Sequence, residues 1–257
     1  MSVEPAIVLE LENVGKTFRN GAGTAFQAVR SASLKVAAGE TVALVGESGS
    51  GKSTLGRIAL GLVQPDGGAV RLDGNDLTSL KGAELREART TMQPVFQDAT
   101  ASLNPRRRIW DLLRQASYRY AGDFEPYAIG LLEGVGLRPG ADYLWRFPHE
   151  LSGGQRQRFT IARALAMRPR LIVADEALSG ADVSIRGEIL NLLLDIQREQ
   201  GVAYLMITHD ISVARAFADR VVVMRHGEIV ETGKAIEVLT EPRHEYTQRL
   251  LAAVPGL

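Results

Sequence analysis

Two kinds of hydrophobic pattern alternate along this 257-residue chain. The segments AIVLELENV (6–14) and SASLKVAAG (31–39) alternate apolar and polar residues, which predicts half-buried strands. Short apolar runs that end in a glycine or a polar residue predict buried strands at TVALVG (41–46), RLIVAD (170–175) and AYLMITH (203–209). Helical periodicity lies between the strands, most clearly at 52–63, 184–200 and 211–218. The segment 220–231 has the pattern of a hairpin that turns at His226 and Gly227.

Strands that alternate with helices predict an α/β fold, with a mainly parallel sheet that is covered on both faces. The first strands are expected to pair antiparallel, which makes the sheet structure mixed. Between 98 and 149 the pattern is helical and is broken by Gly and Pro. We therefore expect a core of residues 1–97 and 150–257 and a helical subdomain of residues 98–149, which runs into a helix at 152–168.

Composition and charge exclude several classes of function. Thirty basic residues balance thirty acidic ones, so no overall field attracts nucleic acid or an anionic membrane. The chain has no cysteine, which excludes disulfides and thiolate metal sites. Its longest apolar stretches are far shorter than the roughly 18 residues of a membrane span. The first residues, MSVEP, lack the basic region of a signal peptide, so we expect a cytoplasmic protein.

The sequence GESGSGKS fits the phosphate-loop pattern G-x-x-x-x-G-K-[ST], and it lies between a predicted strand and a predicted helix. Glycines let successive N–H groups turn inward around phosphate oxygens. Lys52 supplies a positive charge for the β- and γ-phosphates, and the Ser53 hydroxyl is suited to bind Mg²⁺. The alternative, a Gly-rich turn without a ligand, fits this context less well. The predicted nucleotide-binding residues here are Gly46, Glu47, Ser48, Gly49, Ser50, Gly51, Lys52, Ser53 and Thr54.

Magnesium needs a second oxygen ligand, and Asp175 ends an apolar strand at the expected edge of the sheet. Glu176 follows at once and is placed to deprotonate or orient the attacking water. Taken alone, the pair has an alternative interpretation, in which the two acids cap the helix that follows. Gln97 is a candidate to contact magnesium or the water, and His209 to reach the γ-phosphate, although a polar loop residue and a structural histidine are the alternative interpretations.

A second Gly-rich turn, LSGGQ (151–155), opens another predicted helix. It has neither a lysine nor a metal ligand, so it is not expected to hold ATP alone. Free N–H groups and the positive end of the helix suit it to contact a γ-phosphate that a second chain already holds. We expect Ser152, Gly153, Gly154 and Gln155 to complete such a site in a head-to-tail dimer.

The order of GESGSGKS, VFQD, LSGGQRQR, LIVADE and THD resembles the ATP-binding subunit of an ABC (ATP-binding cassette) transporter, over nearly the whole chain. The resemblance implies a P-loop NTPase cassette that binds ATP and Mg²⁺ and hydrolyses ATP. It implies that Gln97 is the Q-loop glutamine, Asp182 the D-loop aspartate and His209 the switch histidine. It also implies that Phe18 stacks on adenine, although the strand pattern alone favours a core position for this ring. The helical middle then resembles the part that meets membrane subunits.

Two segments, VFQDATASLNPR (95–106) and PRHEYTQRLLAAVP (242–255), resemble the peptide/nickel subfamily of importers. That resemblance implies a subunit that energises uptake of a peptide, a metal chelate or a similar small solute. It implies two transmembrane permease subunits, a second ATP-binding subunit that is identical or related, and indirectly an extracytoplasmic solute-binding protein. It implies a peripheral location on the cytoplasmic face of the inner membrane. The alternative is a non-transport ABC ATPase of a soluble enzyme assembly, such as the carbon–phosphorus lyase system.

The chain departs from the family pattern after Glu176, where DEALSGADVS replaces the usual DEPTSALD. Ala177 stands in the position of proline, and Gly180 and Ala181 replace Ala-Leu. Glycine adds backbone freedom and the loss of proline relaxes the turn. We therefore expect weaker coupling between the two ATP sites of a dimer.

Overall fold

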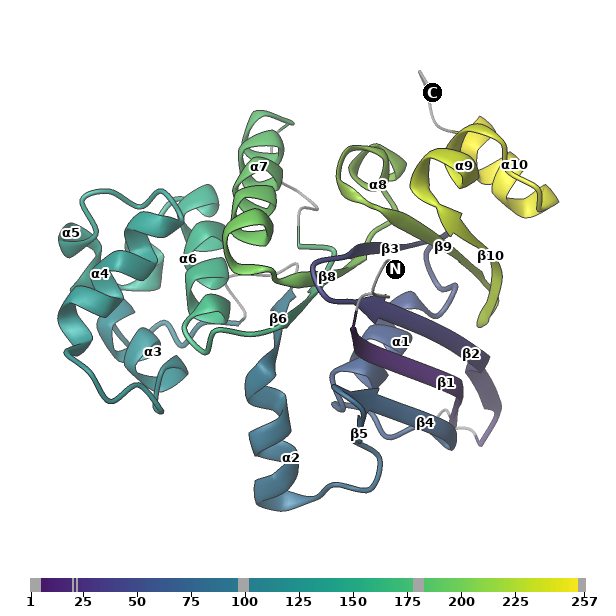
Figure 1. Ribbon diagram of the computed structural model, residues 1–257, viewed down its shortest axis with the longest axis horizontal. Helices are drawn as coiled ribbons and strands as arrows, with labels where there is room; N and C mark the ends of the chain where they lie inside the picture. The colour runs from purple at the N-terminus through teal and green to yellow at the C-terminus, as the bar shows by residue number, and fades with distance from the viewer. Residues whose placement is uncertain (1–5, 20, 22, 97–101, 178–182, 254–257) are drawn as a thin grey trace, which may run out of the picture.

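The computed structural model describes residues 6–19, 21, 23–96, 102–177 and 183–253. Its strands form two sheets, and helices lie between the sheets and on the far face of the larger one (Figure 1). The fold is α/β, as the alternation of strand and helix patterns predicts.

The smaller sheet is antiparallel and contains the N-terminal strands. Its order is β2 (Ala25–Ala37), β1 (Ile7–Arg19), β4 (Gly67–Leu72) and β5 (Asn75–Asp76). The two predicted N-terminal strands are parts of these longer β1 and β2 strands. Alternation along β1 buries Leu9 and Leu11, and a register shift before Val14 keeps that residue in the core as well.

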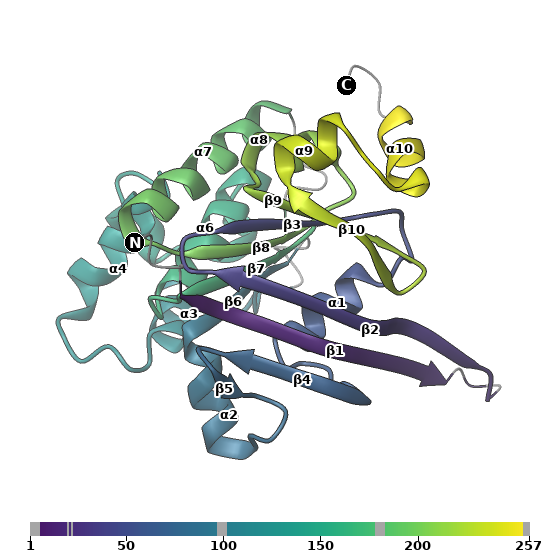
Figure 2. The ribbon, with the colours of Figure 1, turned by 45° about the vertical axis from the view of Figure 1, so that its right-hand side comes forward.

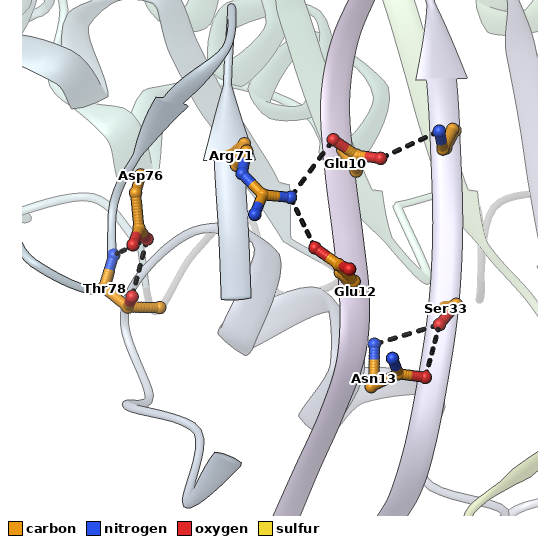
Figure 3. Close-up of polar contacts among 8 residues, drawn as sticks. Glu10, Glu12, Asn13, Ser33, Arg71, Asp76 and Thr78 are labelled. Carbon is orange, nitrogen blue, oxygen red and sulfur yellow. Dashed lines mark hydrogen bonds and ion pairs between the residues drawn. The ribbon is translucent and has the colours of Figure 1, made fainter. Parts of the chain in front are cut away.

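Charged side chains line the exposed face of this sheet (Figure 3). Arg71 on β4 reaches two β1 carboxylates, with its Nη1 atom 2.6 Å from Glu12 and 3.4 Å from Glu10. Lys35 on β2 lies 2.8 Å from the other Glu10 oxygen, and its hydrogen bond is the main cause of the lowered pKa of Glu10. Because these pairs are exposed, they add little to stability and mainly keep this face polar.

The larger sheet holds the strands expected to carry the site. Its order is β10 (Glu228–Lys234), β9 (Arg220–Arg225), β3 (Thr41–Val45), β8 (Ala203–Ile207), β7 (Leu171–Asp175) and β6 (Met92–Phe96). All neighbours are parallel except β9 and β10, which form the predicted hairpin. Its turn residues, His226 and Gly227, both have positive φ, which suits the twist of a tight hairpin. The mixed, mainly parallel sheet is thus confirmed.

Residues of the larger sheet alternate between two cores. On β3, Val42 and Leu44 point toward α1 (Lys52–Ala59), which lies between the two sheets (Figure 2). Ala43 and Val45 point to the opposite face. That face is covered by α7 (Val183–Gln200), α8 (Ile211–Phe217), α9 (Ala235–Thr240) and α10 (Glu245–Ala252). Burial on both faces explains the continuous apolar runs of the central strands.

The segment before the second Gly-rich turn is helical, as expected. It contains α3 (Ile109–Ala116), α4 (Phe124–Gly134) and α5 (Ala141–Leu144), followed by a 3₁₀ turn (Pro148–Glu150) and α6 (Gly153–Leu165). These helices gather on one side of the molecule, at the left of Figure 1. The expected helix 152–168 ends earlier, because Arg168 has a positive φ and Pro169 follows it. The remaining helices, α2 (Gly82–Ala88) and a 3₁₀ turn (Arg89–Thr91), precede β6.

Candidate active site

The phosphate loop leaves β3 at Val45 and enters α1 at Lys52. Two of its glycines are required by close backbone contacts. A Cβ atom at Gly46 would lie 2.2 Å from the Met224 carbonyl oxygen, and one at Gly51 would lie 2.3 Å from the Ala28 carbonyl oxygen. Both also have positive φ, at 149° and 104°. The glycine spacing of the motif therefore lets the loop pack tightly against β2 and β9.

Lys52 is buried inside this loop. Its Nζ atom donates to the carbonyl oxygens of Gly46 and Glu47, both at 2.8 Å, and to Ser50 Oγ at 3.3 Å. Burial lowers the pKa of Lys52, and the neighbouring acids Glu176 and Asp175 oppose that effect. The ammonium group is therefore held at the centre of the curled loop, where a bound phosphate would meet it.

The two candidate metal ligands that the structure describes lie together. Ser53 Oγ, in the first turn of α1, donates to Asp175 Oδ1 at the end of β7, at 3.0 Å. Burial raises the pKa of Asp175, and the hydrogen bond from Ser53 opposes this. Two oxygen atoms from residues 122 positions apart in the sequence thus meet at the carboxyl edge of the sheet.

Glu176 follows Asp175 and has an unusual backbone conformation, with φ of 49°. Its N–H donates to the carbonyl oxygen of Ile207, the last residue of β8, at 2.9 Å. Its side chain lies 3.1 Å from Nδ1 of His209, which comes two residues after β8. The two residues that were predicted from different motifs are therefore direct neighbours.

Two of the predicted residues lie outside the described part of the chain. Gln97 follows Phe96, which pairs with Asp175 in the parallel register of β6 and β7. Asp182 precedes α7, and the altered Gly180 and Ala181 are its neighbours. Of the residues after Glu176, Ala177 is buried, and its carbonyl oxygen accepts a hydrogen bond from Gln157 of α6 at 2.6 Å.

The second Gly-rich turn caps α6. Ser152 Oγ accepts a hydrogen bond from the Gln155 N–H at 3.2 Å, and Gln155 Oε1 accepts one from the Ser152 N–H at 2.9 Å. Ser152 and Gly153 are exposed. A Cβ atom at Gly154 would only reach ordinary contact with Ile185, at 3.5 Å. Tight packing therefore does not explain these glycines.

Within one chain the two Gly-rich turns belong to different parts of the fold. Helix α6 packs against β6, α3 and α4, whereas α1 packs against β2, β7 and β8 (Figure 1). The expectation that LSGGQ serves a second chain is compatible with this arrangement.

Phe18 lies near the end of β1 and is 41% exposed, so the strand-based expectation of a core position is wrong. Its partner across the ladder, Phe26 on β2, is exposed as well, so this end of the strand pair is not covered by described residues. The preceding residues are fixed by Asp66, which accepts from Lys16 Nζ and from the Thr17 N–H, both at 2.7 Å. An exposed ring on a fixed strand is suited to stack on a base.

Two contacts to the phosphate loop were not predicted as parts of the site. The Gly227 N–H donates to the Ser50 carbonyl oxygen at 2.9 Å, although the sequence indicated only a hairpin turn there. The Glu47 N–H donates a hydrogen bond to the Tyr246 hydroxyl at 3.1 Å, although the sequence HEYT indicates only a resemblance to importer tails. No local pattern signals contacts between segments so far apart in the sequence.

In the described part of the chain, no group of three or more His, Cys, Asp or Glu side chains could hold a metal ion. A site that shares Mg²⁺ with substrate phosphates needs only one or two carboxylates, so this finding is compatible with the pair of Ser53 and Asp175. Among the same residues, no helix is long and apolar enough to cross a membrane.

Comparison with known proteins places this geometry in a family. The ABC transporter family matches residues 29–179. The dipeptide transport ATP-binding protein DppF of Lactococcus lactis subsp. cremoris is 44% identical over 98% of this chain and 83% of its own length. The glutathione import ATP-binding protein GsiA of Escherichia coli is 50% identical over 89% of this chain. That match spans 37% of GsiA, so this chain corresponds to just over a third of that protein.

Solved structures give the same result. The bacterial ABC transporter cassette MJ0796, solved as a dimer, has a TM-score of 0.79 and 32% identity, covering 88% of this chain and 98% of that one. The protein cbiO1 from Clostridium perfringens, part of the ABC transporter complex cbiONQ, has a TM-score of 0.80 and 26% identity, covering 97% and 96%. The cassette fold and the resemblance carried by the motifs are confirmed, and the chain belongs to the ABC transporter family as an ATP-binding, ATP-hydrolysing subunit.

Proposed function

We propose that this chain binds ATP at the carboxyl edge of its larger sheet and uses hydrolysis to energise uptake of a peptide or similar small solute. The observation that carries the proposal is the convergence of Lys52, Ser53, Asp175, Glu176 and His209 at neighbouring strand ends. These residues come from motifs that are up to 157 positions apart in the sequence. Together they supply a positive charge, oxygen ligands for a metal ion and a base, which are the groups that hydrolysis of ATP needs.

The phosphate loop is the main binding element for the triphosphate. The phosphate loop's N–H groups other than that of Glu47, which Tyr246 already accepts, attract the phosphates together with the N-terminus of α1. Lys52 exchanges its present carbonyl partners in the loop for β- and γ-phosphate oxygens. The exposed Phe18 ring supplies a surface on which adenine stacks.

The pair of Ser53 and Asp175 fits a magnesium site, because a hydroxyl and a carboxylate oxygen lie 3.0 Å apart beside the loop. Gln97 is the third candidate ligand. Magnesium bound there would neutralise charge on the phosphates.

Glu176 acts as the base that orients and deprotonates the attacking water. Its backbone is fixed to the end of β8, and His209 holds its carboxylate from the side. His209 is more exposed than Glu176, which leaves it accessible to a γ-phosphate.

The turn at Ser152, Gly153, Gly154 and Gln155 completes the site of a second chain. The Ser152 hydroxyl and the N–H groups of Gly153 and Gly154, at the start of α6, then meet a γ-phosphate held by that chain's phosphate loop. Asp182, outside the described residues, is the further candidate for the shared interface. ATP favours the closed dimer because it contacts both chains, and hydrolysis removes the bridging phosphate. The similar cassette MJ0796 was solved as a dimer, which supports pairing of two such chains.

The transported solute is proposed from the relatives. DppF is named for dipeptide transport and GsiA for glutathione import, and both solutes are small peptides. We therefore favour a peptide importer, with a second identical or related ATP-binding subunit, two permease subunits and an extracytoplasmic solute-binding protein. The chain would sit peripherally on the cytoplasmic face of the inner membrane.

A basic groove is suited to meet the permease subunits. It has a volume of about 630 Å³, and no acidic side chain is among its described lining residues. Four arginines line it, from the segment before β6, the segment before α3, and α6: Arg86, Arg89, Arg107 and Arg163. The groove lies where the proposed helical subdomain, residues 98–149, meets the proposed core, residues 1–97 and 150–257. A permease segment with acidic side chains would complement this charge.

Affinity purification of the tagged chain from its native host, in mild detergent, tests the proposal. We expect two polytopic membrane proteins and a second ATP-binding subunit to be recovered. A double variant, Arg86→Glu with Arg107→Glu, should lose the membrane proteins but still bind ATP, because both residues lie outside the phosphate site. Recovery of soluble enzymes alone would contradict the importer proposal and favour the non-transport assembly.

A further inference from the structure

The C-terminal helix reaches the phosphate loop through one hydroxyl group. Tyr246, the second residue of α10, accepts a hydrogen bond from the Glu47 N–H at 3.1 Å. Only 4% of Tyr246 is exposed, so its hydroxyl has a fixed environment. Glu47 is the second residue of the loop, and the residues that follow it, Ser48 and Gly49, are exposed.

Two contacts hold Tyr246 directly, and a third holds the two residues that precede α10. His244 caps α10, with its Nδ1 atom accepting from the Tyr246 N–H at 3.1 Å. Glu231 on β10 accepts from the N–H groups of Arg243, at 2.8 Å, and His244, at 3.1 Å. The guanidinium of Arg225 lies over the Tyr246 ring, 5.0 Å from its centroid. The start of α10 is therefore attached to the β9–β10 hairpin.

The same hairpin holds the other side of the loop. Its turn residue Gly227 donates to the Ser50 carbonyl oxygen at 2.9 Å. The exposed turn at Ser48 and Gly49 thus lies between two attachments, one at Ser50 and one at Glu47. Both originate in the C-terminal quarter of the chain.

We propose that Tyr246 is a positioning residue that holds the phosphate loop in its binding conformation before ATP arrives. The inference rests on the proposed function of that loop. Successive backbone N–H groups that point to one side of a curled loop form a nest for phosphate oxygens. Such a nest binds phosphate tightly only if the loop is already curled, because ordering a free loop during binding lowers the affinity. The Tyr246 hydroxyl accepts from an N–H at the beginning of the nest and restricts that motion.

The substitution Tyr246→Phe tests this role, because it removes the hydroxyl and keeps the ring in the core. Tyr204→Phe is the matched control: its buried hydroxyl also makes a 3.1 Å bond to a backbone group, the Leu193 carbonyl oxygen, away from the loop. We expect both variants to lose similar thermal stability. Tyr246→Phe should raise the dissociation constant for Mg·ATP by about three- to tenfold, as expected for one lost hydrogen bond. Tyr204→Phe should leave it unchanged.

A second variant removes the donor instead of the acceptor. Proline at position 47 has no N–H, and Glu47 does not have the positive φ that would exclude proline. In a Glu47→Pro background, Tyr246→Phe should have no further effect on the ATP dissociation constant. Equal ATP affinity of Tyr246→Phe and the wild type would overturn the inference, and so would an equal affinity loss in both tyrosine variants. Failure of the wild-type chain to bind Mg·ATP at all would instead contradict the proposed function.

Discussion

At the scale of single residues, the conformation of Glu176 is the most informative feature. A non-glycine residue with φ of 49° is uncommon and is maintained only where the surroundings fix it. Here the Ile207 carbonyl oxygen holds the backbone and His209 contacts the carboxylate. The carboxylate is close enough to Lys52 of the phosphate loop to oppose the lowering of the Lys52 pKa by burial.

Replacement of this carboxylate tests the role of base. Glu176→Gln keeps the size and the hydrogen-bonding shape of the side chain, so ATP should bind with nearly unchanged affinity. Hydrolysis should fall by roughly 10²- to 10⁴-fold, because the amide cannot accept the proton. The measurements are equilibrium ATP binding and steady-state turnover in the assembled dimer, with Glu188→Gln on α7 as a surface control. Turnover at the wild-type rate would show that Glu176 is not the base.

Much of the site could be predicted at this scale, because its motifs are local. The loop at 46–54 needs glycines and a lysine at fixed spacing, and that spacing is readable in the sequence. The contact between Glu47 and Tyr246 joins residues 199 positions apart, and no periodicity signals it. The exposure of Phe18 was also unpredictable from the strand pattern, because it depends on what covers the end of the strand.

At the scale of elements, the β10–α10 connection depends on one carboxylate. Burial acts to raise the pKa of Glu231, but the hydrogen bonds that the carboxylate accepts outweigh burial and leave the pKa lowered. A carboxyl group whose pKa is lowered by folding stabilises the folded state fully when the pH is above its ordinary pKa, here 4.5. That stabilisation is lost as the pH falls through the folded-state pKa.

The lowered pKa of Glu231 predicts how the stability of the variant Glu231→Gln should change with pH. At pH 7 the variant should be less stable than the wild type by about 1 kcal/mol. This is less than a buried hydrogen bond to a charged group contributes, because solvent partly reaches the site. The difference from the wild type should shrink as pH falls below 4.5. Denaturant unfolding at pH 7 and at several lower pH values measures it. A difference that stays constant over the whole range would show that the charge of Glu231 is not the stabilising factor.

Elements with strong periodicity were predictable, and short connecting elements were not. The central strands β3, β7 and β8 coincide closely with apolar runs, because burial on both faces leaves no polar position. The two-residue strand β5 and the six-residue helix α9 are too short to show a period. Helix α1 ends at Ala59, before the predicted residue 63, because Gly61 adopts a positive φ that terminates the helix.

At the scale of the whole molecule, one chain carries two Gly-rich turns, both proposed to contact phosphate, in different parts of its fold. The phosphate loop lies at the end of the inner strand β3, and the LSGGQ turn caps a helix that packs on the edge strand β6. Separate placement is what a head-to-tail dimer requires, since each nucleotide then contacts the loop of one chain and the turn of the other. In such a dimer, ATP hydrolysis would change how the two chains associate.

The central claim is tested most directly by comparing ATP binding and turnover in Gly154→Asp and Lys52→Ala. Gly154 has room for a side chain, so its variant should fold, and Gly130→Asp on α4 is a control with the same added charge. Each chain is assayed as a dilute monomer for ATP binding and in the assembled dimer for hydrolysis. We predict that Lys52→Ala loses ATP binding in the monomer, whereas Gly154→Asp binds ATP like the wild type and fails to hydrolyse it. If monomeric Gly154→Asp lost ATP binding as severely as Lys52→Ala, the LSGGQ turn would act within its own chain and the composite site would be contradicted.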